Sequence, residues 1–318
     1  MSTKPDIYTR ITEKIVADLE QGDLTWLRPW HTEHPAGPVI RPLRATGQPY
    51  QGINILMLWL AALEHGFSAP IWLTYRQAQE LGGQVRKGEQ GSSIVYTRQI
   101  TRQEVSEEGE ETESDIFLHK GYIVFNVEQI DGLPDHFYAP GVSPLDPAAR
   151  LEKAERFFAA TRAEIRHGGN RAYYDSTQDI IQMPRFEAFQ TPEGYAGTKA
   201  HELIHWTKHP SRLDRDFGRK RWGDEGYAME ELVAELGAAF LCADLQVMPQ
   251  PDPNHAAYIA SWLNVLNRDK RAIFTAASHA QRAAEHLHRC QIQEAAPSPQ
   301  EDLPEAAEAL QYVQGRLL

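Results

Sequence analysis

The sequence contains few cysteines and no long apolar segment. Only Cys242 and Cys290 are cysteines, so a disulfide framework of the kind that supports small secreted domains is not expected. The longest apolar run covers residues 55–63, far short of the roughly 20 residues that span a membrane. The N-terminus has no apolar signal segment. We therefore expect a cytoplasmic protein that has no membrane partner.

The chain also lacks the excess of basic residues that is typical of nucleic-acid-binding proteins. It has 32 Lys and Arg against 44 Asp and Glu, a formal net charge of -12 that by itself disfavours a nucleic-acid partner. The charge is unevenly distributed. Seven of the acids fall in one stretch: Glu104, Glu107, Glu108, Glu110, Glu111, Glu113 and Asp115. Residues 41–102, in contrast, hold seven basic and three acidic side chains, which leaves room for a local basic surface.

The length of 318 residues is typical of two domains, since single domains usually have about 100–200 residues. Four prolines and two glycines cluster between residues 132 and 147, which indicates a linker. We predict an N-terminal domain over 1–140, a Pro-rich linker over 141–147, a second domain over 148–290 and a polar tail over 291–318.

Hydrophobic periodicity gives the expected elements of each domain. In the first, we expect helices over 7–21, 54–65 and 75–81, and a hairpin of strands 92–100 and 116–127 around a solvated acidic loop. In the second, we expect helices over 148–167, 197–207, 227–245, 253–267 and 269–289, and a hairpin over 172–183. The fold class is therefore α+β: a small mixed α/β domain followed by a mainly helical domain with a short sheet.

The sharpest motif is His201-Glu202-Leu203-Ile204-His205, in a segment with helical signals. Four residues advance a helix by about 400°, so both imidazoles leave the same face and can share one cation. Glu202 lies where a carboxylate can reach a water molecule at the metal without binding the metal itself. That is the position of a general base in metal-assisted hydrolysis.

A third metal ligand has to come from another helix. His209 is too far along the axis, about 12 Å from His201, and the elongated three-histidine motif is absent because Ser211 occupies its last position. Glu231 and Glu235 lie one turn apart on a later predicted helix. We predict that Glu231 is the ligand and that Glu235 orients a histidine, with Glu230 as the nearest alternative ligand. Two imidazoles and a carboxylate suit Zn²⁺, or another divalent transition metal.

The N-terminal half contains what a protein needs to bind single-stranded DNA: basic side chains for phosphates and aromatic rings for bases. Arg86 and Lys87 lie in the glycine-rich segment 82–91, where backbone amides can also approach a phosphate. A plain solvated turn is the alternative for this segment. Arg44, Trp30 and Tyr50 complete the candidate DNA-binding residues. Trp59 and Trp72, with apolar neighbours, are interpreted as core residues.

Several separate motifs in a fixed order resemble the ArdC-like antirestriction family. They are Asp6-Ile7-Tyr8, Leu19-Glu20-Gln21-Gly22, Pro29-Trp30, Tyr50-Gln51-Gly52-Ile53-Asn54, Trp72-Leu73-Thr74, the segment 82–89, Val124-Phe125-Asn126-Val127-Glu128-Gln129, the segment 201–207 and the segment 230–235. The resemblance covers about residues 6–290. It implies an N-terminal single-stranded-DNA-binding domain and a C-terminal zincin-like metallopeptidase domain, carried by plasmids and other mobile elements. In the gluzincin arrangement that it implies, His201, His205 and Glu231 hold the metal and Glu202 is the base.

The expected function is protection of incoming DNA from restriction, through single-stranded-DNA binding and a peptidase site that acts on an unknown protein substrate. Two alternatives stay open. In one, the protein coats single strands without catalysis and the metal only stabilises the C-terminal scaffold. In the other, the protein is a metallopeptidase with no nucleic-acid partner, which the N-terminal resemblance opposes.

Overall fold

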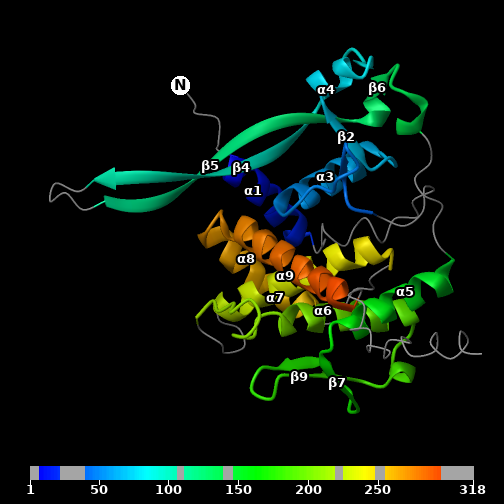
Figure 1. Ribbon diagram of the computed structural model, residues 1–318, viewed down its shortest axis with the longest axis vertical. Coiled ribbons are helices and arrows are strands. Elements are labelled where there is room, and N and C mark those ends of the chain that lie inside the picture. Colours follow the sequence, from blue (N-terminus) through cyan, green and yellow to red (C-terminus); the bar gives the residue numbers. More distant parts are fainter. Residues whose placement is uncertain are drawn as a thin grey trace, which may run out of the picture.

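The computed structural model describes residues 7–21, 40–105, 111–138, 146–218, 225–247 and 255–294. The helices are α1 (Ile7–Glu20), α3 (Ile53–His65), α4 (Tyr75–Glu80), α5 (Pro147–Ala160), α6 (Pro192–Trp206), α7 (Glu225–Leu245), α8 (His255–Arg268) and α9 (Ala272–Glu294). The strands are β1 (Leu43–Arg44), β2 (Ile71–Thr74), β3 (Gln84–Val85), β4 (Ser92–Val105), β5 (Glu111–Asn126), β6 (Ile130–Asp131), β7 (Glu164–His167), β8 (Tyr173–Asp175) and β9 (Ile180–Met183). This arrangement confirms the α+β fold class, with a mixed first half and a mainly helical second half (Figure 1).

The first half is built on a four-stranded sheet in the order β1-β2-β5-β4. Alternation along the strands gives it two apolar faces. On one face, Trp72 and Val124 pack with Leu58 of α3. On the other face, Leu73 packs with Val85 and with the residues around β6. The burial of Trp72, 1% exposed, and of Trp59, 4% exposed, confirms that both are core residues.

The hairpin of β4 and β5 is confirmed, but it is longer than expected. The two strands are paired from Ser92 with Val124 to Val105 with Glu111, and the hairpin projects away from the rest of the molecule (Figure 1). Glu104, Glu111, Glu113 and Asp115 are therefore strand residues and not part of a loop, which corrects the expected strand ends. The remaining acidic residues of this stretch lie outside the described residues.

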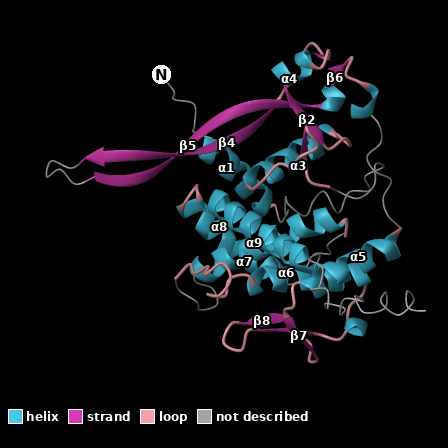
Figure 2. Cartoon of the chain, in the orientation of Figure 1, coloured by secondary structure: helices cyan, strands magenta, loops and turns pink. Residues whose placement is uncertain are grey.

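The second half is organised around α7, which is buried along nearly its whole length and contacts α5, α6, α8 and α9. Below these helices, the small sheet β7-β9-β8 packs against α6 (Figure 2). No helix in the described part of the chain is long and apolar enough to cross a membrane.

The expected helix over 148–167 is wrong in its last part. Helix α5 ends at Ala160, where the Thr161 hydroxyl donates to the Phe158 carbonyl and Arg162 takes a left-handed conformation with φ 58°. Residues 164–167 instead form β7, which pairs in parallel with β9. The β-branched Ile165 favours this strand, because it lies beside Ile181 in the register.

The two halves of the chain share one hydrophobic core. Ile15 of α1 and Trp59 of α3 are buried in the same cluster as residues of α6, α7 and α9, and the Trp59 ring lies edge-on to Phe240 of α7. Arg41 adds a buried polar link: it donates to Asp244 at 2.7 Å and to Gln281 at 3.0 Å. Residues 139–145, which include most of the predicted linker, lie outside the described residues.

Helices α6 and α7 approach each other at Gly237. A Cβ atom at this position would lie 2.8 Å from both Cγ1 and Cδ1 of Ile204. Glycine therefore permits a close contact between the helices that a larger residue would widen.

We predict that Gly237→Ala lowers the free energy of unfolding. Overpacking typically costs about 1–3 kcal/mol, more than the roughly 1 kcal/mol that alanine gains over glycine in a helix. Ile204→Ala alone should cost about 2–5 kcal/mol through a cavity, which the new methyl group partly fills in the double variant. Urea denaturation of both single variants and the double variant would measure this coupling, and strictly additive losses would contradict it.

Candidate metal centre and nucleic-acid surface

Helix α6 positions His201 and His205 on one face. Thr191 caps the N-terminus of the helix, because its hydroxyl accepts a hydrogen bond from the Gly194 amide at 3.0 Å, and the helix ends at Trp206. The Nε2 atoms of the two imidazoles are 3.1 Å apart. His209 lies beyond the helix, as expected, with its ring beside the Ser211 hydroxyl.

Glu231 comes from α7 and completes a set of three donors. Its carboxylate oxygens lie 3.6 Å from His201 Nε2 and 3.5 Å from His205 Nε2. One ligand atom from each of the three residues lies within 4.8 Å of the others. Two imidazole nitrogens and one carboxylate oxygen that converge in this way can hold one divalent transition metal, which leaves further coordination positions open.

The second ring nitrogens of both histidines are also engaged. His201 Nδ1 lies 3.2 Å from Glu235, where the sequence predicted an orienting carboxylate. His205 Nδ1 lies 2.9 Å from Glu230, which the sequence offered only as an alternative ligand. Because a metal-binding imidazole commonly donates its other N–H to a carboxylate, two histidines call for two such partners. A search of the sequence for this second carboxylate would therefore have indicated Glu230.

Arg215 was not found by sequence reasoning, and it fixes Glu230 in place. Its guanidinium donates to both Glu230 oxygens, at 2.8 and 2.9 Å, and its side chain is 1% exposed. It also donates to the Ile204 carbonyl at 2.9 Å and to the Thr207 hydroxyl at 3.1 Å. Arg215 therefore ties the end of α6 to α7 through three polar partners, although it belongs to no motif in the sequence.

The electrostatics of the centre favour a cation. Burial opposes ionisation of Glu230, but hydrogen bonds from Arg215 and His205 lower its pKa to about 2. Burial also lowers the pKa of His201, but hydrogen bonds with Glu231 and Glu235 outweigh burial and raise it well above its ordinary value. A site that attracts protons onto a buried imidazole has an excess of negative charge, which a bound metal ion would neutralise.

Glu202 differs from the other acids of the centre. It is 5% exposed, and its Oε2 atom has no hydrogen-bond partner among the residues that the structure describes. Burial raises the pKa of this carboxyl above its ordinary value, against the opposing charge of His201 and His205. A buried carboxylate oxygen without a protein partner, next to three convergent donors, fits a centre that accommodates a metal ion and a water molecule.

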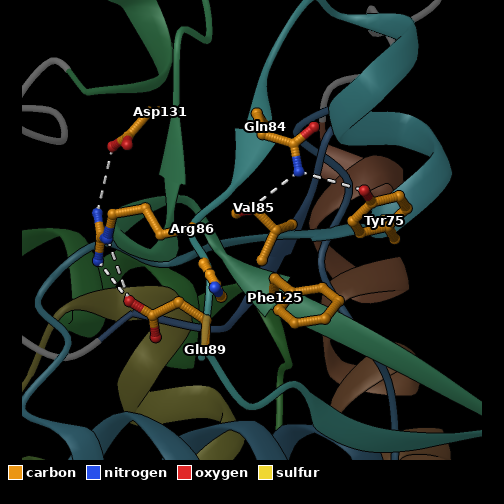
Figure 3. Close-up of a pocket in the computed structure, with 8 residues that line it drawn as sticks. Tyr75, Gln84, Val85, Arg86, Glu89, Phe125 and Asp131 are labelled. Atoms are coloured by element: carbon orange, nitrogen blue, oxygen red, sulfur yellow. Dashed lines mark hydrogen bonds and ion pairs between the residues drawn. The ribbon is translucent and has the colours of Figure 1, made fainter.

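The predicted DNA-binding residues fall into two groups on opposite faces of the sheet. Arg86 and Lys87 follow β3 and line a pocket with Tyr75 and Phe125 (Figure 3). Arg44 lies outside this pocket, and its guanidinium lies over the Tyr50 ring, 5.4 Å from the centroid. Tyr50 itself is 5% exposed and packs in the cluster of Trp72, which argues against direct stacking on a base. Trp30 lies outside the described residues.

Two family models match the chain. The N-terminal domain of anti-restriction factor ArdC matches residues 5–125, and a zincin-like metallopeptidase domain matches residues 152–279. A solved structure, the metal-free antirestriction ArdC protein from plasmid R388, is 46% identical with a TM-score of 0.75, and covers 91% of this chain and 99% of its own. The chain belongs to the ArdC antirestriction family.

Other relatives place this ArdC-family chain among proteins of different sizes. The uncharacterized protein y4eC of Sinorhizobium fredii (strain NBRC 101917 / NGR234) is 44% identical over 90% of this chain and 92% of its own length. A DNA primase TraC of Escherichia coli is 36% identical over 92% of this chain, which spans only 28% of that primase. The Mn(II)-bound structure of the R388 ArdC protein, 45% identical, has a TM-score of 0.73 and covers 90% of this chain and 98% of its own.

We predict that Glu230→Gln weakens metal binding to the ArdC-family centre by about 10- to 100-fold, because His205 loses a charged partner that orients its ring. Competition with a chromophoric chelator on the full chain measures the affinity. Glu225→Gln is the matched control, since Glu225 is an exposed residue of α7 that pairs with Arg268 away from the centre. Wild-type affinity in a folded Glu230→Gln variant would show that the contact has no role in metal binding.

Proposed function

We propose that this ArdC-family chain protects the DNA of a mobile element from restriction, and that it does so with a metal-dependent peptidase site and a single-stranded-DNA-binding surface. The observation that carries the peptidase assignment is the unpartnered Oε2 of buried Glu202 beside His201, His205 and Glu231. A metal with a purely structural role needs only its ligands. It does not need Glu202, a further buried carboxylate that destabilises the fold.

In this proposal, His201, His205 and Glu231 hold the metal, and Glu235 and Glu230 orient the two histidines. A divalent metal held there would act as a Lewis acid on the peptide carbonyl. Glu202 would take a proton from the water as its oxygen bonds to the carbonyl carbon, and would pass that proton to the amine as the C–N bond breaks. Burial raises the pKa of the Glu202 carboxyl, which makes the carboxylate a stronger base for the water proton, while the carboxylic acid that results is still acidic enough to protonate an amine.

Zn²⁺ is the metal that we propose, because histidine nitrogen and carboxylate oxygen in a three-ligand set are typical of catalytic zinc. The R388 relative has been solved with Mn(II), so another divalent transition metal is the alternative. Metal analysis of the protein purified from its natural host would decide between them.

A protein substrate would bind along the small sheet. Strand β8 pairs with β9 on one side only and lies at the sheet edge, and it contacts α6. An extended peptide can add to such an edge through main-chain hydrogen bonds. The Tyr174 ring of β8 lies under the Lys208 ammonium, just beyond the C-terminal end of α6, so a peptide on this edge would lie near the end of the helix that carries His205. Both cysteines are unpaired, which fits the cytoplasmic location that we propose for the protein.

We predict that Glu202→Gln retains the metal and the fold but slows peptide hydrolysis by about 100- to 10,000-fold, the usual contribution of a general base. Cleavage of a quenched fluorescent peptide library by the full chain measures hydrolysis. Glu231→Ala is the matched comparison, which should lose hydrolysis together with the metal. Undiminished hydrolysis in Glu202→Gln would contradict the assigned base.

The same variant separates the two functional alternatives. Antirestriction is measured as the survival of unmodified plasmid DNA that enters a restricting host. Loss of this protection in Glu202→Gln supports proteolysis as the mechanism. Full protection without hydrolysis would instead support the alternative in which the protein coats single strands and the metal stabilises a scaffold.

For DNA binding, Lys87 is the phosphate-contacting residue that we propose. Arg86 is less available, because its guanidinium is held by Glu89 at 2.7 Å and by Asp131 at 3.4 Å. Lys87 has no acidic partner within the part of the chain that the structure describes, and it lines the same pocket. The match of residues 5–125 to the N-terminal domain of ArdC supports this half of the chain as the DNA-binding half.

We predict that Lys87→Gln makes the salt dependence of single-strand binding shallower by about 0.7 in a log–log plot, the slope for one neutralised phosphate. Fluorescence anisotropy with a labelled oligonucleotide across a salt series measures the slope. Lys153→Gln is the control, because Lys153 is an exposed residue of α5 in the other half of the chain. An unchanged slope in Lys87→Gln would place the phosphate contacts elsewhere.

A further inference from the structure

The described part of the N-terminal half holds an open pocket beside β3. Its volume is about 620 Å³, within the roughly 300–1,000 Å³ that is typical of small-molecule sites. It is lined by Tyr75, Gln84, Val85, Arg86, Lys87, Glu89, Phe125 and Asp131, so it is separate from the candidate metal centre (Figure 3).

One wall of the pocket is a fixed aromatic ring. Tyr75 is 44% exposed, and its ring lies edge-on to Phe125 with 6.4 Å between centroids. Its hydroxyl accepts a hydrogen bond from Gln84 Nε2 at 3.2 Å, and the same nitrogen donates to the Val85 carbonyl at 3.0 Å. Because the Tyr75 ring is already held at its edge and at its hydroxyl, it loses little side-chain entropy when a ligand binds against its exposed face.

Gly91 allows Phe125 to take its place in this wall. A Cβ atom at residue 91 would lie 2.9 Å from a ring carbon of Phe125, closer than side chains come in folded proteins. The chain therefore passes next to the Phe125 ring only because residue 91 has no side chain. Phe125 in turn supports Tyr75, so the aromatic wall depends on a close backbone approach.

The pocket lining holds two basic and two acidic side chains, and Lys87 is the one without an ionic partner among the residues that the structure describes. Arg86 lies between Glu89 and Asp131 (Figure 3). Glu89 also accepts a hydrogen bond from Gln129 at 3.0 Å. Hydrogen bonds from Gln129 and then from Arg86 hold the pKa of Glu89 below its ordinary value, so this pair is ionised at neutral pH. A neutral group fits beside this compensated lining, and the Lys87 ammonium, which no carboxylate of the described residues holds, is available to an adjacent anion.

We propose that this pocket receives one unstacked base of a single DNA strand, with the base against the Tyr75 ring and a neighbouring phosphate at Lys87. A flat, neutral ring joined to an anion is the chemistry that the lining matches. In a duplex the bases are paired and stacked, so only a single strand can present a base in this way. The inference rests on the DNA binding proposed above and adds the position at which a base is held.

The test compares strands with and without bases. Fluorescence anisotropy on the full chain would use a labelled oligothymidylate of about 12 nucleotides and an abasic strand of the same length. For Tyr75→Ala, we expect the affinity for oligothymidylate to fall by about 5- to 150-fold, the range for loss of one base–aromatic stack. Its affinity for the abasic strand should equal that of the wild type. Tyr75→Phe, which keeps the ring, should retain most of the affinity for oligothymidylate.

Tyr96→Ala is the matched control. Tyr96 is a similarly exposed tyrosine, 53% exposed, and it lies on β4 outside the pocket. The pocket assignment is overturned if Tyr75→Ala binds oligothymidylate as the wild type does, if it loses affinity equally for both strands, or if Tyr96→Ala has the larger effect. If the wild-type protein binds neither strand at low salt, the proposed DNA binding itself fails, and the pocket assignment fails with it.

Discussion

The close contact of α6 with α7 sets the geometry of the candidate metal centre. Both histidines come from α6, and all three carboxylates that touch them come from α7, so the distance between two helix axes decides every one of these contacts. Gly237 sets that distance by admitting the Ile204 side chain against the backbone of α7. All three candidate metal donors lie on these two helices, and a centre on packed helices is more rigid than one on loops.

This geometry requires charged groups in a place where charge is expensive. Glu202, Glu230, Glu231 and Glu235 are all at most 7% exposed, and taking such groups from water costs several kcal/mol each unless they are paired. Arg215 pairs with Glu230, and the histidines contact Glu231 and Glu235. Glu202 is left without compensation at one oxygen. A buried, uncompensated carboxylate lowers the stability of the fold, and natural proteins retain such groups mainly at functional sites.

The sequence predicted the parts of the centre that follow from helical periodicity. The spacing of His201 and His205 placed them on one face, and Glu235 was correctly placed beside a histidine because it lies one turn from Glu231.

Arg215 could not be predicted, because it lies in an irregular turn and acts through a contact that only the folded chain creates. The end of α5 was missed for a similar reason: β7 forms by pairing with β9, a partner whose register no local pattern reveals. Local sequence patterns also could not predict that Arg86 pairs with Asp131, 45 residues away, so the sequence indicated an unpaired basic residue.

The shared core has a consequence for how the two proposed activities relate. Trp59 packs against Phe240, and Arg41 bonds Asp244, at the opposite end of α7 from Glu231. The helix that carries the proposed third metal donor is therefore also the helix against which the N-terminal half packs, so the halves do not behave as modules on a flexible tether. A strand held by the N-terminal half would lie at a fixed orientation to the metal centre. Hydrolysis would then be directed to proteins that are close to the bound DNA, because a rigid link raises the effective concentration of such neighbours alone.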